Sequence, residues 1–120
     1  MRRKPGALVP LEAAICVTAA AWFADGLREF HGYQLAKQLA RDANRQLFVA
    51  HGTLYRALAR LEAMGLLSSR REDPVIAAQE NRPGRRFYTL TATGQAAAEE
   101  ARRTAADTIG RRRVRRLAPA

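Results

Sequence analysis

Apolar residues recur at helical spacing in the first third of the chain. Residues 10–24 are predicted to form a helix, because Pro10 suits a first turn and the following Asp25 and Gly26 suit an end. Its predicted buried face consists of Leu11, Ile15, Thr18 and Trp22. A second amphipathic helix is predicted from about 32 to about 43, with a stripe made of Leu35, Ala36 and Leu39.

The stretch 50–67, AHGTLYRALARLEAMGLL, has the pattern of a third helix with two different faces. Leu54, Leu58 and Leu61 cluster on one side when the segment is projected at about 100° per residue. The opposite side, with Thr53 at its margin, consists of Gly52, Arg56, Ala59, Arg60 and Ala63. Gly65 stands where a left-handed residue is expected after the helix end.

The pattern changes after this helix. The segments 66–73 and 85–91 are predicted to be the strands of a hairpin, and Tyr88 and Leu90 alternate with Phe87 and Thr89 in the second. The segment between them, 74–84, has two prolines, an asparagine and a glycine and is predicted to be a loop. Thr91 suits the N-cap of a last, alanine-rich helix.

Three helices, a hairpin and a helix, in this order, are typical of a winged helix-turn-helix in which the hairpin is the wing. The predicted fold class is mainly α with a small β-hairpin. We assign 1–91 to a winged helix-turn-helix domain and 92–120 to a C-terminal helix with a basic tail. A length of 120 residues suits one such domain.

Positive charge is concentrated at the two ends of the chain, whose formal net charge is +10. Residues 102–120 hold seven arginines and one acidic residue, and 2–4 add three cations. This asymmetry favours contact with a polyanion, nucleic acid before an anionic membrane, and a solubilising role is the plain alternative. No apolar run is long enough for a membrane span, and we read the N-terminus as a helix rather than a signal peptide.

Three ordered blocks carry a resemblance to a known family: HGYQLAKQL at 31–39, GTLYRALARLEAMGLL at 52–67 and RPGRRFYTLTATG at 82–94. They resemble the PadR-type transcriptional regulators. The resemblance implies a homodimeric repressor that dimerises through its first and last helices and places its third helix in the major groove of a double-stranded DNA operator. It also allows a small hydrophobic effector held by Trp22 and Phe23, for which plain packing is the alternative. Where the family often has Ser-Pro before GTLYR, this chain has Ala50 and His51.

The polar face of the third helix is the first candidate DNA-binding surface. Its small residues allow a close approach, and Arg56 and Arg60 are available for phosphate or for guanine O6 and N7. His51 and Thr53 flank this face near the helix start. Tyr55 is expected either to give its hydroxyl to a phosphate or only to pack in the core. A solvated helix face is the alternative for the whole surface.

The predicted wing is the second candidate. Arg70 and Arg71 lie on its outgoing strand, and Arg82, Arg85 and Arg86 lie on or before its returning strand. Arginines gain from the negative potential of a narrow A·T minor groove and from phosphate neutralisation. The alternative is a charged edge that blocks strand pairing.

No catalytic motif is present in the sequence, so we expect neither an enzyme nor a cofactor. The two histidines lack metal-ligand spacing with the one cysteine, Cys16, which is expected to be an inert small hydrophobe. A lone cysteine fits a reducing, cytoplasmic location. Two rival functions remain: a winged-helix module for protein interaction, and non-specific nucleic-acid binding.

Overall fold

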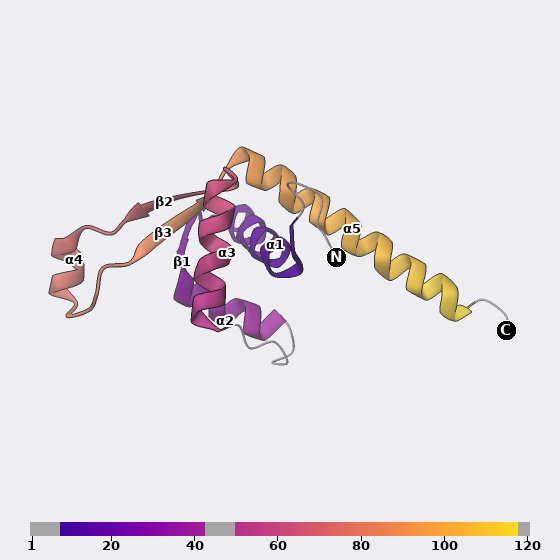
Figure 1. Ribbon diagram of the computed structural model, residues 1–120, viewed down its shortest axis with the longest axis horizontal. Helices are drawn as coiled ribbons and strands as arrows, with labels where there is room; N and C mark the ends of the chain where they lie inside the picture. Colours follow the sequence, from indigo (N-terminus) through magenta and orange to yellow (C-terminus); the bar gives the residue numbers. More distant parts are fainter. Residues whose placement is uncertain (1–7, 43–49, 118–120) are drawn as a thin grey trace.

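The computed structural model describes residues 8–42 and 50–117, with side chains in these ranges as far as 105. In chain order the elements are α1 (Pro10–Ala24), β1 (Glu29–His31), α2 (Gly32–Asp42), α3 (His51–Ala63), β2 (Leu67–Arg71), α4 (Pro74–Gln79), β3 (Arg86–Leu90) and α5 (Ala92–Leu117). The first three helices form the body, the wing projects on one side and α5 on the other (Figure 1). The fold is the predicted winged helix-turn-helix.

The sheet has three antiparallel strands in the order β1-β3-β2, one strand more than the predicted hairpin. Phe30 of β1 pairs with Tyr88 of β3, and Ser69 of β2 pairs with the other edge of Tyr88. β1 was not predicted, because its three residues are too few to establish an alternating pattern. Its effect is to fix the start of α2 against the base of the wing.

The wing tip also differs from the prediction, because the segment 74–84, which was predicted to be a loop, begins with a helical turn, α4. Pro74 occupies a first-turn position, where its missing N–H costs nothing, and the Asp73 carboxylate accepts a hydrogen bond of 2.9 Å from the Val75 N–H. Asn81, at φ 51°, then reverses the chain. The tip is therefore a capped helical turn rather than an open loop.

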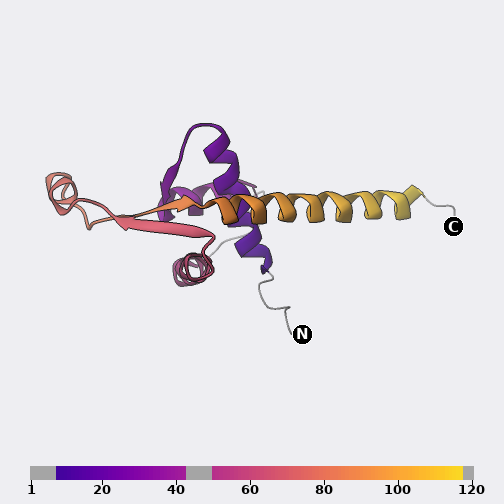
Figure 2. The same ribbon diagram turned by 90° about the horizontal axis from the view of Figure 1, so that it is seen from above.

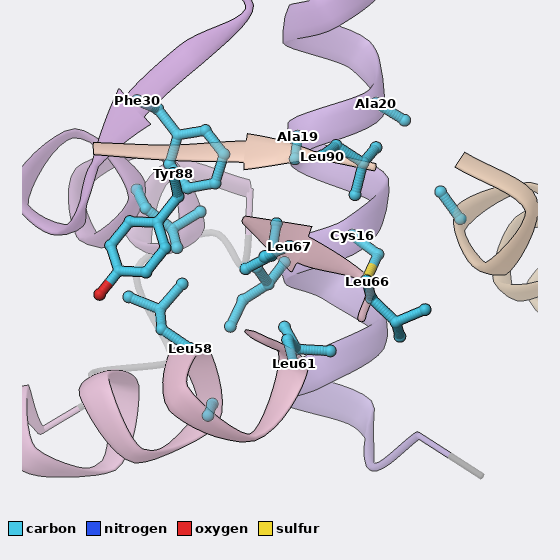
Figure 3. Packing of buried hydrophobic residues seen from close by; sticks show 14 of the residues in the cluster. Cys16, Ala19, Ala20, Phe30, Leu58, Leu61, Leu66, Leu67, Tyr88 and Leu90 are labelled. Atoms are coloured by element: carbon cyan, nitrogen blue, oxygen red, sulfur yellow. The ribbon is translucent and has the colours of Figure 1, made fainter. Parts of the chain in front are cut away.

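The core lies where α1, α2 and α3 meet one face of the sheet (Figure 3). The predicted stripe of α3 is confirmed, since Leu54, Leu58 and Leu61 are all buried. On the predicted face of α1, Ile15 and Thr18 are buried, and Leu11 and Trp22 are half-buried against the core. The buried face also extends to Cys16, Ala19 and Ala20.

Cys16 is itself buried, and burial raises the pKa of its thiol to about 11. Because the thiolate is the reactive form, this supports the expectation of an inert side chain.

Two predicted helix boundaries are confirmed in detail. Gly65 follows α3 with φ +77°, the left-handed conformation expected of a glycine after a helix end. Thr91 caps α5, because its Oγ1 accepts a 3.0 Å hydrogen bond from the Gly94 N–H and donates one of 2.6 Å to the Gly65 carbonyl. The wing base and the start of α5 are thereby tied to the end of α3.

Candidate nucleic-acid interface

The surface of α3 that faces away from the core is a continuous stripe of exposed residues. Its members are His51, Gly52, Thr53, Tyr55, Arg56, Ala59 and Ala63. They lie opposite the buried leucines because apolar residues recur every three or four positions along α3. The stripe is unobstructed by side chains larger than alanine over its C-terminal half, so another surface can approach the helix backbone there.

Arg56 is an exposed charged side chain of α3, whereas Arg60 and Glu62 are half-buried. Its Nη2 donates a 3.4 Å hydrogen bond to the Thr53 hydroxyl. In the part of the chain that the structure describes, no carboxylate lies within ion-pair distance of Arg56. The guanidinium therefore stays available to an outside acceptor.

The N-terminus of α3 is held by aromatic contacts instead of a side-chain cap. Ala50 supplies no capping hydrogen bond, as its chemistry predicts. The ring of His51 lies 4.5 Å from that of Tyr55, measured between centroids. The Tyr55 hydroxyl lies so close to Gly32 that a Cβ there would force the tyrosine ring to shift. Tyr55 thus packs against α2 and still exposes about a third of its surface.

Arg60 is a half-buried member of the face that lies opposite the leucines. Its Nε is 2.7 Å from Oε2 of Glu12, a buried residue of α1, while the arginine side chain remains 40% exposed. The sequence placed Arg60 among the outward residues, and the structure adds a partner on another helix.

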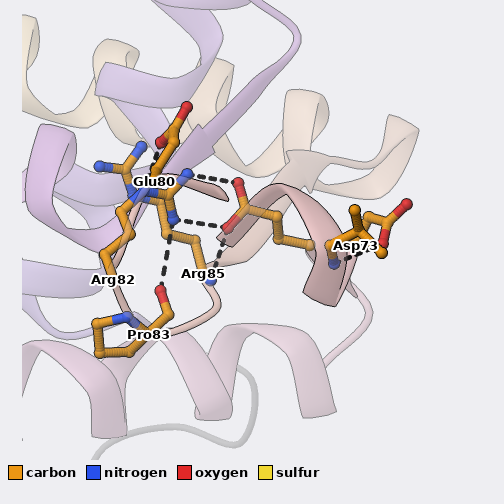
Figure 4. A network of polar contacts seen from close by, with 7 residues as sticks. Asp73, Glu80, Arg82, Pro83 and Arg85 are labelled. Atoms are coloured by element: carbon orange, nitrogen blue, oxygen red, sulfur yellow. Dashed lines mark hydrogen bonds and ion pairs between the residues drawn. The ribbon is translucent and has the colours of Figure 1, made fainter. Parts of the chain in front are cut away.

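Arg82 is the most firmly held arginine of the wing (Figure 4). Its two terminal nitrogens contact both oxygens of the buried Glu72 at 2.6 and 2.7 Å, and its Nε contacts Glu80 at 2.7 Å. The hydrogen bonds from Arg82, with further help from the Arg85 N–H, lower the pKa of Glu72 to about 2. This network closes the loop behind α4, so Arg82 has a structural role.

Arg70 and Arg86 are also paired. Arg70 contacts both oxygens of Glu29 at 2.6 and 2.9 Å and lies over the Phe87 ring. Arg86 donates a 2.9 Å hydrogen bond to the Ser69 hydroxyl and lies 4.0 Å from Glu62. The Arg70–Glu29 pair connects the two edge strands, β2 and β1, which lie on opposite sides of β3. Arg86 connects β3 to its neighbour β2 and to the end of α3.

The guanidinium groups of Arg71 and Arg85 form no ion pair with an acidic side chain among the described residues, although the charge of Arg85 helps to lower the pKa of Glu72. Both line a hollow at the wing tip whose floor includes Ala77 of α4. Of the five wing arginines proposed from the sequence, these two present unpaired charge to the outside.

The acidic partners Glu12, Glu29 and Glu72 were missed by the sequence analysis. Glu29 and Arg70 are 41 positions apart, so no local spacing links them. Glu12 carried one usable signal, since a glutamate at the third helical position reaches back to the N-cap, and here it accepts the Val9 N–H at 3.0 Å.

The predicted effector residues Trp22 and Phe23 are half-buried and already in contact with neighbours. The Trp22 ring lies 5.5 Å from that of Phe30, and the Arg28 guanidinium lies 5.1 Å over Phe23. Neither residue lines the wing-tip hollow. An effector at this place stays a prediction.

Within residues 8–42 and 50–105, no three potential ligand side chains gather to hold a metal ion. No helix in the described part of the chain has both the length and the apolar character needed to cross a membrane. The basic run 111–116 falls within α5, but its side chains lie outside the described residues.

Comparison with known proteins agrees with this geometry. A family model described as the transcriptional regulator PadR-like family matches residues 25–100. A transcriptional regulator of Mycobacterium tuberculosis is 44% identical over 75 residues, which are 62% of this chain and 62% of that protein. The match thus spans less than two thirds of the relative's length.

Solved structures share the fold. A PadR-like regulator of Bacillus cereus superposes with a TM-score of 0.68 at 20% identity, over 91% of this chain and 93% of that one. PadR of Bacillus subtilis, solved in complex with operator DNA, gives 0.55 at 21% identity, over 76% and 45% of the two chains. Because the family match covers more than half of the sequence, and because the winged helix and its ordered motifs are all present, this chain belongs to the PadR-like family of transcriptional regulators.

Proposed function

We propose that the protein is a sequence-specific DNA-binding regulator that reads the major groove with α3. The observation that carries this proposal is the exposed stripe opposite the leucine core, with small residues around the unpaired Arg56. A helix about 10–12 Å across fits a major groove about 12 Å wide, provided that no bulky side chains hold it away. Arg56 is then placed to donate to guanine O6 and N7 or to a phosphate.

The proposed DNA contacts also include the start of α3 and the wing. His51, Thr53 and Tyr55 stand at the end of the stripe nearest α2, where hydroxyl and ring N–H groups meet phosphates. Arg71 and Arg85 supply phosphate contacts from the wing tip, since neither guanidinium forms an ion pair within the described chain. The helical tip makes the wing broader than a bare hairpin, which favours contact with the backbone beside a groove over deep insertion.

We also propose that the protein acts as a homodimer formed by α1 and α5. Only the first turns of α5 lie against α1, and the helix then extends away from its own body (Figure 2). A second copy offers a partner for such an arm, and a two-fold dimer presents two α3 helices to a palindromic site. We further propose that the protein acts in the cytoplasm and represses transcription. A small hydrophobic effector that binds near Trp22 and Phe23 relieves this repression.

A competition gel shift tests the proposed function. The labelled probe is the region upstream of the protein's own gene, and the competitors are the same unlabelled duplex and a random duplex of equal length. We expect the specific competitor to displace the probe at concentrations at least about a thousandfold lower. Equal displacement by both would leave non-specific nucleic-acid binding, and no shift at all would favour a protein-interaction module.

A further inference from the structure

A buried carboxylate joins α1 to α3. Glu12 is 3% exposed, its Oε1 accepts the Val9 N–H at 3.0 Å, and its Oε2 lies 2.7 Å from Nε of Arg60. A carboxylate away from water is tolerated when it is charge-paired and hydrogen-bonded. Glu12 is therefore a fixed point to which both the start of α1 and the second half of α3 are attached.

The same contact orients Arg60. The contact is an ion pair rather than an aligned hydrogen bond, because the buried Nε of Arg60 has no hydrogen-bond partner in the described part of the chain. The side chain as a whole is 40% exposed, so the exposed share belongs to its other atoms. A guanidinium is planar with five N–H donors in a rigid fork, so fixing Nε restricts where the terminal nitrogens point. Those nitrogens bond to no residue in the described part of the chain. Arg60 also follows Arg56 by four positions, so the two side chains are neighbours on α3.

We propose that Glu12 is a positioning residue for DNA recognition, which holds Arg60 by its Nε so that the terminal nitrogens are presented to DNA beside Arg56. This inference rests on the proposed function. A free arginine loses rotamer freedom when it binds, and an arginine that is held beforehand loses less. Glu12 thus contributes to binding without touching DNA.

The sign of a mutational effect separates this role from simple charge. A negative group close to DNA opposes binding of the phosphate backbone, so its removal raises affinity if charge alone matters. Its removal lowers affinity for a preferred sequence if it positions Arg60. A loss of stability alone would change affinity for every duplex equally.

The experiment compares full-length wild type with Glu12→Gln, which keeps an acceptor for the Val9 N–H. The probes are the duplex that wild type enriches from a random-sequence library and a random duplex of the same length. We expect the Kd for the enriched duplex to rise about tenfold, the order of one lost base contact, and the Kd for the random duplex to stay level or fall. Asp25→Asn removes one negative charge from an exposed site after the end of α1, outside both helices of the proposed dimer, and is expected to keep the wild-type preference.

Arg60→Lys provides a second test, because it keeps the charge but loses the planar fork. It is expected to lose the same preference, and adding Glu12→Gln to it is expected to cause no further loss. Wild-type preference in either single variant, or additive losses in the double variant, would overturn the proposal. If circular dichroism shows that Glu12→Gln is unfolded, Arg60→Lys decides alone. A wild type that enriches no duplex contradicts the proposed function instead.

Discussion

An arginine of this protein is available for DNA contact only where no acidic side chain already holds its guanidinium in an ion pair. The sequence identified the arginines of α3 and the wing but not their ion pairs, because Glu29, Glu72 and Glu12 come from other elements. The structure divides them into arginines that hold the fold together, with Arg82 the clearest case, and arginines whose charge faces outward, with Arg56 the clearest.

The unpaired wing arginines are expected to set the salt dependence of binding. Replacing both Arg71 and Arg85 by alanine should lower the slope of log K against log salt by about two per protomer, since each neutralised phosphate contributes about 0.9. Filter binding over a salt series measures the slope. Arg102 and Arg103, exposed on α5, are the matched control pair for the same two substitutions. A slope equal to that of wild type in the wing variant would exclude these phosphate contacts.

The Glu72–Arg82 pair predicts an acid-sensitive wing tip. The pKa of Glu72 in the fold, about 2, is below its ordinary value of 4.5, so the pair stabilises the tip above about pH 4.5 and this stabilisation is lost as the pH falls toward 2. An NMR titration of the Glu72 carboxyl carbon should show the low midpoint in wild type and a return toward 4.5 in Arg82→Gln. An ordinary midpoint in wild type would contradict the geometry of Figure 4.

Among the helices and strands, the longer ones could be predicted from the sequence and the shortest ones could not. α1, α2, α3 and β3 follow from periodicity, β2 follows from its place in the predicted hairpin, and α5 follows from its alanine content and the Thr91 cap. β1 and α4 are short, and α4 begins in a segment whose prolines, asparagine and glycine indicate a loop. The start of α4 was still marked locally, since Asp73 before Pro74 is a good N-cap and first-turn pair.

The end of α3 provides a stability test for this element. Gly65→Ala should destabilise the protein by about 1–2 kcal/mol, because alanine is strained at φ +77° although no atom lies within 4 Å of its added Cβ. Gly52→Ala, inside the helix, is the control and should cause no loss, since its Cβ would meet only Arg56 Nη1 at 3.8 Å. Denaturant unfolding measures both. Equal stability of Gly65→Ala and wild type would show that the chain does not need glycine there.

In the whole molecule, α1 connects α5 to the proposed DNA-binding face of α3. It contacts the first turns of α5 on one side and α3 on the other, and Glu12 makes the polar part of the second contact (Figure 1). A dimer built on α1 and α5 would therefore fix the spacing of the two α3 helices. This link could not be predicted from sequence, because it depends on which way α1 turns its buried face.

If the protein is the proposed dimer, it should sediment at micromolar concentration as a particle of twice the mass of the chain. The two half-sites of its DNA operator should then be centred about 10 base pairs apart, or a multiple of that. Analytical ultracentrifugation with and without DNA measures the first, and footprinting measures the second. A monomer at tens of micromolar under both conditions would contradict the dimer.

The central claim is that the exposed face of α3 reads DNA sequence through Arg56. The most direct test is the ratio of two Kd values, that for a random duplex divided by that for the duplex enriched by wild type. The ratio is measured for wild type and for Arg56→Ala, after thermal unfolding has shown that the two proteins are equally stable. Loss of a guanine contact should cost about 1–3 kcal/mol on the enriched duplex and much less on the random one, so the ratio falls by about tenfold or more. An unchanged ratio in a folded Arg56→Ala protein would contradict the account.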